Sequence, residues 1–123
     1  MILCVDDEPI GLAARQVLLS AAGYTVLTAL RGGNALKLFR YNRVDLVIIA
    51  GPMLDANRAN LVSEMKRLKP EVPIVLFTDL MAPSSEPRQT DLLLTKGITA
   101  SDFLAELAKL LDRKGPVEPR KVD

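Results

Sequence analysis

The sequence of 123 residues contains no histidine and no tryptophan, and it has a single cysteine, Cys4. Without histidine, the chain can use neither imidazole chemistry nor a histidine-ligated metal. One cysteine cannot form a disulfide within the chain, and its position inside an apolar run predicts a buried core residue. These absences exclude several common kinds of catalytic and metal site.

Long apolar runs and charge blocks are also missing. No stretch reaches transmembrane length, and the first residues do not have the pattern of a signal peptide. The 16 basic and 15 acidic residues are scattered and leave a net charge of +1, which gives no reason to expect binding to nucleic acid or to an anionic membrane. We therefore expect a cytoplasmic protein that binds neither.

The length and composition are typical of one compact domain. Periodicity is lost near the C-terminus, where glycine, proline and charged residues alternate. We expect a domain over residues 1–112, followed by a flexible tail or linker stub over residues 113–123.

Short apolar runs alternate with helical patterns along this domain. The runs predict strands at residues 2–5, 25–29, 46–49, 74–77 and 92–94. The helices are expected after Pro9 and before Gly23, from an N-cap at Asn34, from Asn57 or Asn60 to just before Pro70, and after a Thr99–Asp102 capping box. Residues 81–90 have a loop-like composition, so the fourth of five expected helices should be short or missing.

Alternating strands and helices favour an α/β fold with a parallel sheet covered by helices on both faces. The carboxyl ends of the strands in such a sheet meet at one crevice. An acidic pair follows the first strand, Thr78 follows the fourth, and Lys96 follows the fifth. At the end of the third strand stands Ala50, whose methyl group can carry out no chemistry.

Four motifs in this order resemble the receiver domain of two-component response regulators. They are Val5-Asp6-Asp7-Glu8-Pro9, Asp45-Leu46-Val47-Ile48-Ile49 followed by Met53, Pro73-Ile74-Val75-Leu76-Phe77-Thr78, and Leu94-Thr95-Lys96. The resemblance covers residues 1 to about 112. It implies a flavodoxin-like, doubly wound sheet of five strands in the order 2-1-3-4-5, and an ancestral transfer of a phosphoryl group from a histidine kinase to an aspartate.

The resemblance also implies a role for individual residues. Asp6 and Asp7 match the acids that bind Mg²⁺, and the carbonyl of Pro52 matches a backbone ligand of the metal. Thr78 matches the hydroxyl that holds a phosphoryl oxygen, and Lys96 matches the lysine that pairs with the phosphoaspartate. Mg²⁺ prefers such oxygen ligands and neutralises the charge that develops on a phosphoryl group.

Several positions depart from the family pattern. Ala50 replaces the phosphoacceptor aspartate, Asp79 places a carboxylate where a phosphoryl group would arrive, and Leu93 replaces the aromatic switch residue. Leu54, Arg58 and Gly97 replace a proline, a glycine and a proline, respectively. Because the departures cluster at one site, we interpret the chain as a degenerate receiver, or pseudo-receiver, with Mg²⁺ bound weakly or not at all and with no other cofactor.

We expect this domain to act by phosphorylation-independent protein–protein interaction in signal transduction, and not as an enzyme. Its partner would be a histidine kinase, a response regulator, an output domain or a second copy of the chain. Two alternatives stay open. The chain is a phosphoacceptor disabled by an engineered Ala50, or it is a module that binds a small anion through Thr78 and Lys96.

Overall fold

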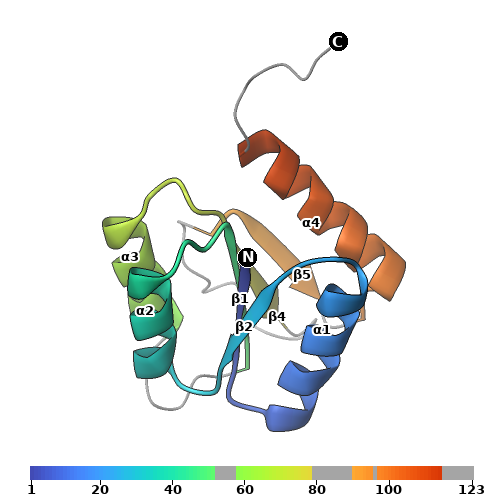
Figure 1. Cartoon of the computed structure of the whole chain (residues 1–123), viewed down its shortest axis with the longest axis horizontal. Coiled ribbons are helices and arrows are strands. Elements are labelled where there is room, and N and C mark those ends of the chain that lie inside the picture. The colour runs from blue at the N-terminus through green and yellow to red at the C-terminus, as the bar shows by residue number, and fades with distance from the viewer. Residues whose placement is uncertain (52–57, 79–89, 96, 115–123) are drawn as a thin grey trace.

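The computed structural model describes residues 1–51, 58–78, 90–95 and 97–114 (Figure 1). Five parallel strands form one sheet in the order β2-β1-β3-β4-β5, as the sequence predicted. The strands are β1 (Ile2–Asp6), β2 (Val26–Ala29), β3 (Leu46–Ala50), β4 (Ile74–Thr78) and β5 (Leu92–Thr95). The described helices are α1 (Pro9–Ala21), α2 (Gly32–Tyr41), α3 (Arg58–Leu68) and α4 (Ala100–Lys114).

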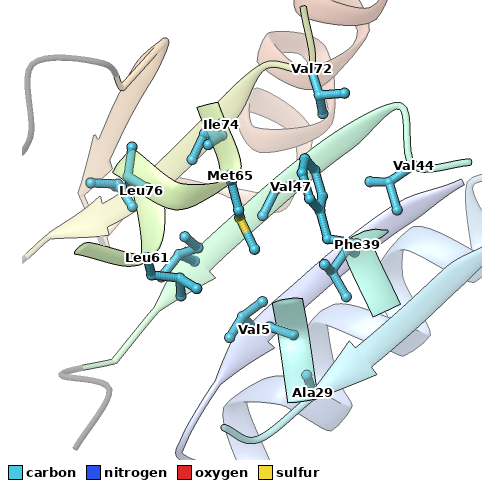
Figure 2. Close-up of a cluster of buried hydrophobic side chains, with 14 residues drawn as sticks. Val5, Ala29, Phe39, Val44, Val47, Leu61, Met65, Val72, Ile74 and Leu76 are labelled. Atoms are coloured by element: carbon cyan, nitrogen blue, oxygen red, sulfur yellow. The ribbon is translucent and has the colours of Figure 1, made fainter. Parts of the chain in front are cut away.

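Helices cover both faces of the sheet. Figure 1 shows α2 and α3 on one side and α1 and α4 on the other. Alternate residues of β1 and β3 point to opposite faces, so each face has its own apolar cluster. Figure 2 shows the cluster beneath α2 and α3, in which Phe39 and Met65 pack against Val5 and Val47. Such continuous apolar strands are typical of a parallel sheet buried on both faces.

The second cluster lies beneath α1 and α4, on the opposite face of the sheet. Cys4 is 1% exposed within it, which confirms the prediction of a buried core residue. Phe77 and Phe103 also belong to it, and their ring centroids are 5.4 Å apart. This cluster fixes the position of α1 over the end of β1.

The predicted N-caps Asn34 and Thr99 can be compared with the structure. Asn34 is not an N-cap, because α2 begins two residues earlier, at Gly32, after Arg31 in an extended conformation. Gly32 and Ala35 are buried in the first turn of this helix, and the Arg31 side chain makes no capping hydrogen bond. Thr99 does cap α4, since its Oγ1 accepts a hydrogen bond from the Asp102 N–H at 3.1 Å.

The C-terminal boundary differs slightly from the expected one. Helix α4 continues to Lys114, two residues beyond the predicted end of the domain at residue 112. The remainder of the predicted tail and the predicted loop at 81–89 lie outside the described residues. Within the described ranges, no helix is both long and apolar enough to cross a membrane.

Candidate functional site

The carboxyl end of β3 lies beside the carboxyl end of β1. Asp6 and Ala50 are register partners in neighbouring strands, as expected for strand ends that meet at one crevice. Ala50 is fully buried and belongs to the apolar cluster under α1 and α4. The residue beside the first acid is therefore part of the core.

Asp6 is buried, with 3% exposure, and both of its carboxylate oxygens are bonded within the chain. Oδ1 accepts the backbone N–H of Glu8 at 2.9 Å, and Oδ2 accepts Nη1 of Arg15 at 2.7 Å. The Arg15 side chain is itself only 18% exposed. A buried carboxylate requires such a charged partner, because desolvation would otherwise favour its neutral form.

Arg15 was not among the site residues predicted from the sequence. The signal was present, because Arg15 follows Leu12 by three residues and precedes Leu19 by four. These spacings place all three on one face of a helix, and both leucines are buried. A charge on the inward face of α1 predicts a buried partner, and that partner is Asp6.

Asp7 approaches the same point from the loop after β1. Gly51 has φ of +83°, and a Cβ built on it would lie 2.6 Å from Asp6 Oδ1 and closer still to Asp7 Oδ1. Only glycine meets both requirements, because it has no Cβ and adopts positive φ without strain. The predicted acidic pair is thus brought together, packed against the backbone that follows Ala50.

Two arginines converge on Phe77 at the end of β4. The Arg15 guanidinium carbon lies 4.9 Å from the centre of the Phe77 ring, within the range of a cation–π contact. Arg58, at the start of α3, donates from Nη2 to the Phe77 carbonyl at 2.7 Å. Arg15 and Phe77 also line a hollow of about 390 Å³ together with Leu18, Ile98, Ala100 and Phe103.

The structure describes only some of the other predicted site residues. Pro52, Asp79 and Lys96 lie outside the described residues. Thr78 ends β4 as the register partner of Thr95, and Leu93 in β5 is 49% exposed. The roles assigned to Thr78, Asp79, Lys96 and Leu93 remain predictions.

A magnesium ion would need several free oxygens at this crevice, because hard cations take six or more oxygen ligands, some of them water. Asp6 and Asp7 are close together, but both Asp6 oxygens are already bonded. No group of three or more acidic or other metal-ligating side chains occurs in the part of the chain described here. Two carboxylates are within the number of protein ligands that Mg²⁺ uses, but Asp6 already binds the Arg15 guanidinium, which disfavours a second cation there. The contribution expected from the Pro52 carbonyl remains a prediction.

Known proteins similar to this chain share both its sequence pattern and its fold. The family "Response regulator receiver domain" matches residues 2–108. Transcriptional regulatory protein GlrR from Escherichia coli strain K12 is 32% identical over 77 residues, which are 63% of this chain and 17% of that protein. Response regulator SaeR from Staphylococcus aureus strain USA300 is 26% identical over 121 residues, 98% of this chain and 46% of SaeR. The chain spans less than half the length of these relatives.

Two solved structures illustrate the similarity in fold. A response regulator receiver domain protein from Clostridium thermocellum has a TM-score of 0.82 and 27% identity, with 92% of this chain and 94% of that chain covered. A receiver domain of sensor histidine kinase PA1611 from Pseudomonas aeruginosa PAO1, with a magnesium ion in its active site cleft, has a TM-score of 0.82. It is 20% identical, covers 90% of this chain and 96% of its own, and supports the fold alone.

Proposed function

The chain belongs to the response regulator receiver domain family, and from that premise we propose that it binds another signalling protein without being phosphorylated at residue 50. It is a receiver domain of two-component signal transduction. We propose further that it is a docking module and not a catalyst of phosphoryl transfer. The partner would be a histidine kinase, a response regulator, an output domain or a second copy of the chain.

The observation that carries this proposal is the state of residue 50. A phosphoacceptor must present a nucleophilic oxygen to solvent and to a donor, but Ala50 has only a methyl group and is fully buried. Asp6, its neighbour in the sheet, is bonded to Arg15 and does not replace the missing nucleophile. The described residues at this crevice thus support a role that does not depend on phosphate.

Helix α1 supports an interaction role. Its only charged residue is Arg15, which is bonded to Asp6, so every exposed position of α1 is uncharged. Ile10 and Val17 are 79% and 69% exposed, and their spacing of seven residues places them on the same side of the helix. Exposed apolar side chains on an uncharged helix face are typical of a protein contact surface.

One observation favours a second candidate, a phosphoacceptor disabled at residue 50. Asp6 and Asp7 still converge on Gly51, so an aspartate at position 50 would join two carboxylates already in place. Binding of a small anion has less support, because the described arginines of this crevice, Arg15 and Arg58, are both engaged within the chain.

The interaction can be tested with variants of α1. Partners would be identified by cross-linking the tagged chain in the cells that produce it, and binding of the purified partner would then be measured by calorimetry. We expect Val17→Glu to weaken binding roughly tenfold or more, because it places a charge at the centre of the uncharged face. Tyr41→Glu is the matched control, since Tyr41 is 76% exposed on α2, on the other side of the sheet.

The same measurement tests independence from phosphate. Binding should be unchanged when acetyl phosphate and Mg²⁺ are added. Sedimentation velocity of the same variants decides whether the partner is a second copy of the chain. A change in affinity with acetyl phosphate, or equal losses for Val17→Glu and Tyr41→Glu, would contradict the proposal.

A further inference from the structure

We propose that the Arg15 guanidinium takes the place of a divalent cation at the acidic pair, so that this crevice is neutralised by the chain itself and works without metal. Arg15 is then a positioning residue, which holds the Asp6 side chain in place. The inference rests on the contacts of Arg15 and does not depend on the proposed interaction with a partner.

The ion pair has the features of a built site. Arg15 Nη1 and Asp6 Oδ2 are 2.7 Å apart, and their side chains are 18% and 5% exposed. The Glu8 N–H holds the other Asp6 oxygen. Each Asp6 oxygen keeps a second lone pair, but a metal ion at Asp6 would be repelled by the guanidinium 2.7 Å from Oδ2, so the guanidinium and a metal compete for the same carboxylate.

The guanidinium is also fixed from its other side. It lies over the Phe77 ring, with 4.9 Å between its carbon and the ring centre. Phe77 is in turn held by its contact with Phe103 and by the hydrogen bond from Arg58 to its carbonyl. A charge clamped between a carboxylate and an aromatic face is preorganised, as a bound metal ion would be.

Gly11 gives an independent indication that α1 is adapted to this contact. A Cβ at position 11 would lie 3.1 Å from Asp6 Oδ2 and 3.6 Å from Arg15 Nη1. Glycine inside a helix costs about 0.5–1 kcal/mol relative to alanine, so its presence here calls for a packing reason. The absent side chain leaves the space through which Arg15, one turn later, reaches Asp6.

The charges of the crevice are consistent with this exchange. Relative to the pattern that the resemblance implies, Ala50 removes one negative charge. Replacing a doubly charged metal by a singly charged guanidinium removes one positive charge. These two changes offset each other, as do the added charges of Asp79 and Arg58, and Asp6 keeps a cation beside it.

The test is direct metal binding. Free Mn²⁺, used in place of Mg²⁺, gives an electron paramagnetic resonance signal that disappears on binding. We expect the unchanged chain to leave this signal intact up to about 1 mM Mn²⁺, and Arg15→Met to bind Mn²⁺ roughly tenfold or more tightly because Asp6 is released. Arg67→Met is the matched control, since it removes an arginine of α3 whose partner, Glu64, is a surface residue.

Thermal unfolding with and without Mg²⁺ gives a second readout. Arg15→Met should lose stability without metal and regain part of it with Mg²⁺, whereas the unchanged chain and Arg67→Met should not respond. If Arg15→Met is unfolded without metal, a Mg²⁺ titration followed by circular dichroism decides: refolding supports the proposal, and persistent unfolding contradicts it.

Two further results would overturn the proposal. One is Mn²⁺ binding by the unchanged chain that is as tight as binding by Arg15→Met. The other is a folded Arg15→Met variant with no gain in Mn²⁺ binding. Neither result bears on partner binding, so the failure of this proposal and the failure of the proposed function can be told apart.

Discussion

The two ends of the sheet use the same chemistry for different purposes. At the amino end of β4, Lys66 of α3 lies 2.8 Å from Asp91, whose carboxylate also accepts the Ile74 N–H at 2.7 Å. At the carboxyl end, Arg15 of α1 lies 2.7 Å from Asp6 of β1. Each pair joins a helix to one end of the sheet.

The difference lies in what these ends ordinarily do. In an open parallel sheet, ligands bind at the carboxyl ends of the strands. Such binding requires polar groups there that are not already hydrogen-bonded within the chain. Here the oxygens of Asp6 are bonded within the chain, as those of a purely structural end would be. Asp6 at the carboxyl end is therefore bonded within the chain, as Asp91 is at the amino end, and this supports the proposed function without phosphate.

The largest expected effect is the loss of the Arg15 side chain. Arg15→Met should lower the free energy of unfolding by about 3 kcal/mol, because it leaves Asp6 charged and buried without its partner. Asp6→Asn combined with Arg15→Met should recover at least half of this loss, since no buried charge remains. Urea unfolding followed by circular dichroism measures both, and equal stability of Arg15→Met and the double variant would contradict the account of a buried carboxylate left without its partner.

A smaller effect is expected at the opposite end of the sheet. Lys66→Met should cost about 1 kcal/mol, because Asp91 is 35% exposed and water can replace part of the interaction. The same unfolding experiment checks this. A loss as large as that of Arg15→Met would remove the distinction between the two ends.

Ionisation of the Cys4 thiol makes the stability of the chain depend on pH. Burial raises the pKa of the Cys4 thiol from its usual 9.0 to about 12, and the nearby Asp6 carboxylate adds to this while Arg15 opposes it. Between these values the unfolded chain loses the thiol proton and the folded chain keeps it, so stability falls as pH rises above 9.0. The slope due to Cys4 is at most about 1.4 kcal/mol per pH unit.

Comparison with Cys4→Ala isolates this contribution from the titration of lysines and tyrosines. The difference in unfolding free energy between the two chains should be constant below pH 9.0 and should shrink above it, as the unchanged chain loses its advantage. A difference that stays constant up to pH 11 would mean that the thiol ionises equally well in the folded chain.

The smallest effect concerns two glycines, both inside helices. Gly33→Ala should stabilise the chain by about 0.5–1 kcal/mol, because a Cβ there would meet nothing within 4 Å. Gly11→Ala should lack this gain or reverse it, because its Cβ would lie 3.1 Å from Asp6 Oδ2, closer than an ordinary van der Waals contact. Equal stabilisation by both substitutions would show that Gly11 has no role in the ion pair.

The fold could be predicted from the sequence because its signals are local. Apolar runs, Pro9, Gly23 and the Thr99 cap each act within a few residues, and the order of elements follows from them. The predicted start of α2 at Asn34 is wrong, because this start is not set by local signals alone. Asn34 is a good N-cap by type, but the helix begins at Gly32 and buries Gly32 and Ala35, a tertiary effect that the type of residue 34 does not indicate.

The site was only partly predictable. The position of Ala50 beside Asp6 follows from the strand pattern, and the structure confirms it. The pairing of Asp6 with Arg15 could not be specified in the same way, because it depends on how α1 lies against β1. The need for glycine at position 51 also could not be predicted from local sequence. The carboxylates that exclude a side chain there belong to another strand and its loop.

The central claim is that residue 50 and its surroundings no longer accept phosphate. Intact-mass spectrometry of the chain after incubation with Mg²⁺ and acetyl phosphate tests it most directly, with Ala50→Asp measured in parallel. We expect no phosphoryl adduct on either protein, because Arg15 already binds the acid that a metal would need. An adduct on Ala50→Asp alone would favour a receiver disabled at one position, and an adduct on the unchanged chain would contradict the claim outright.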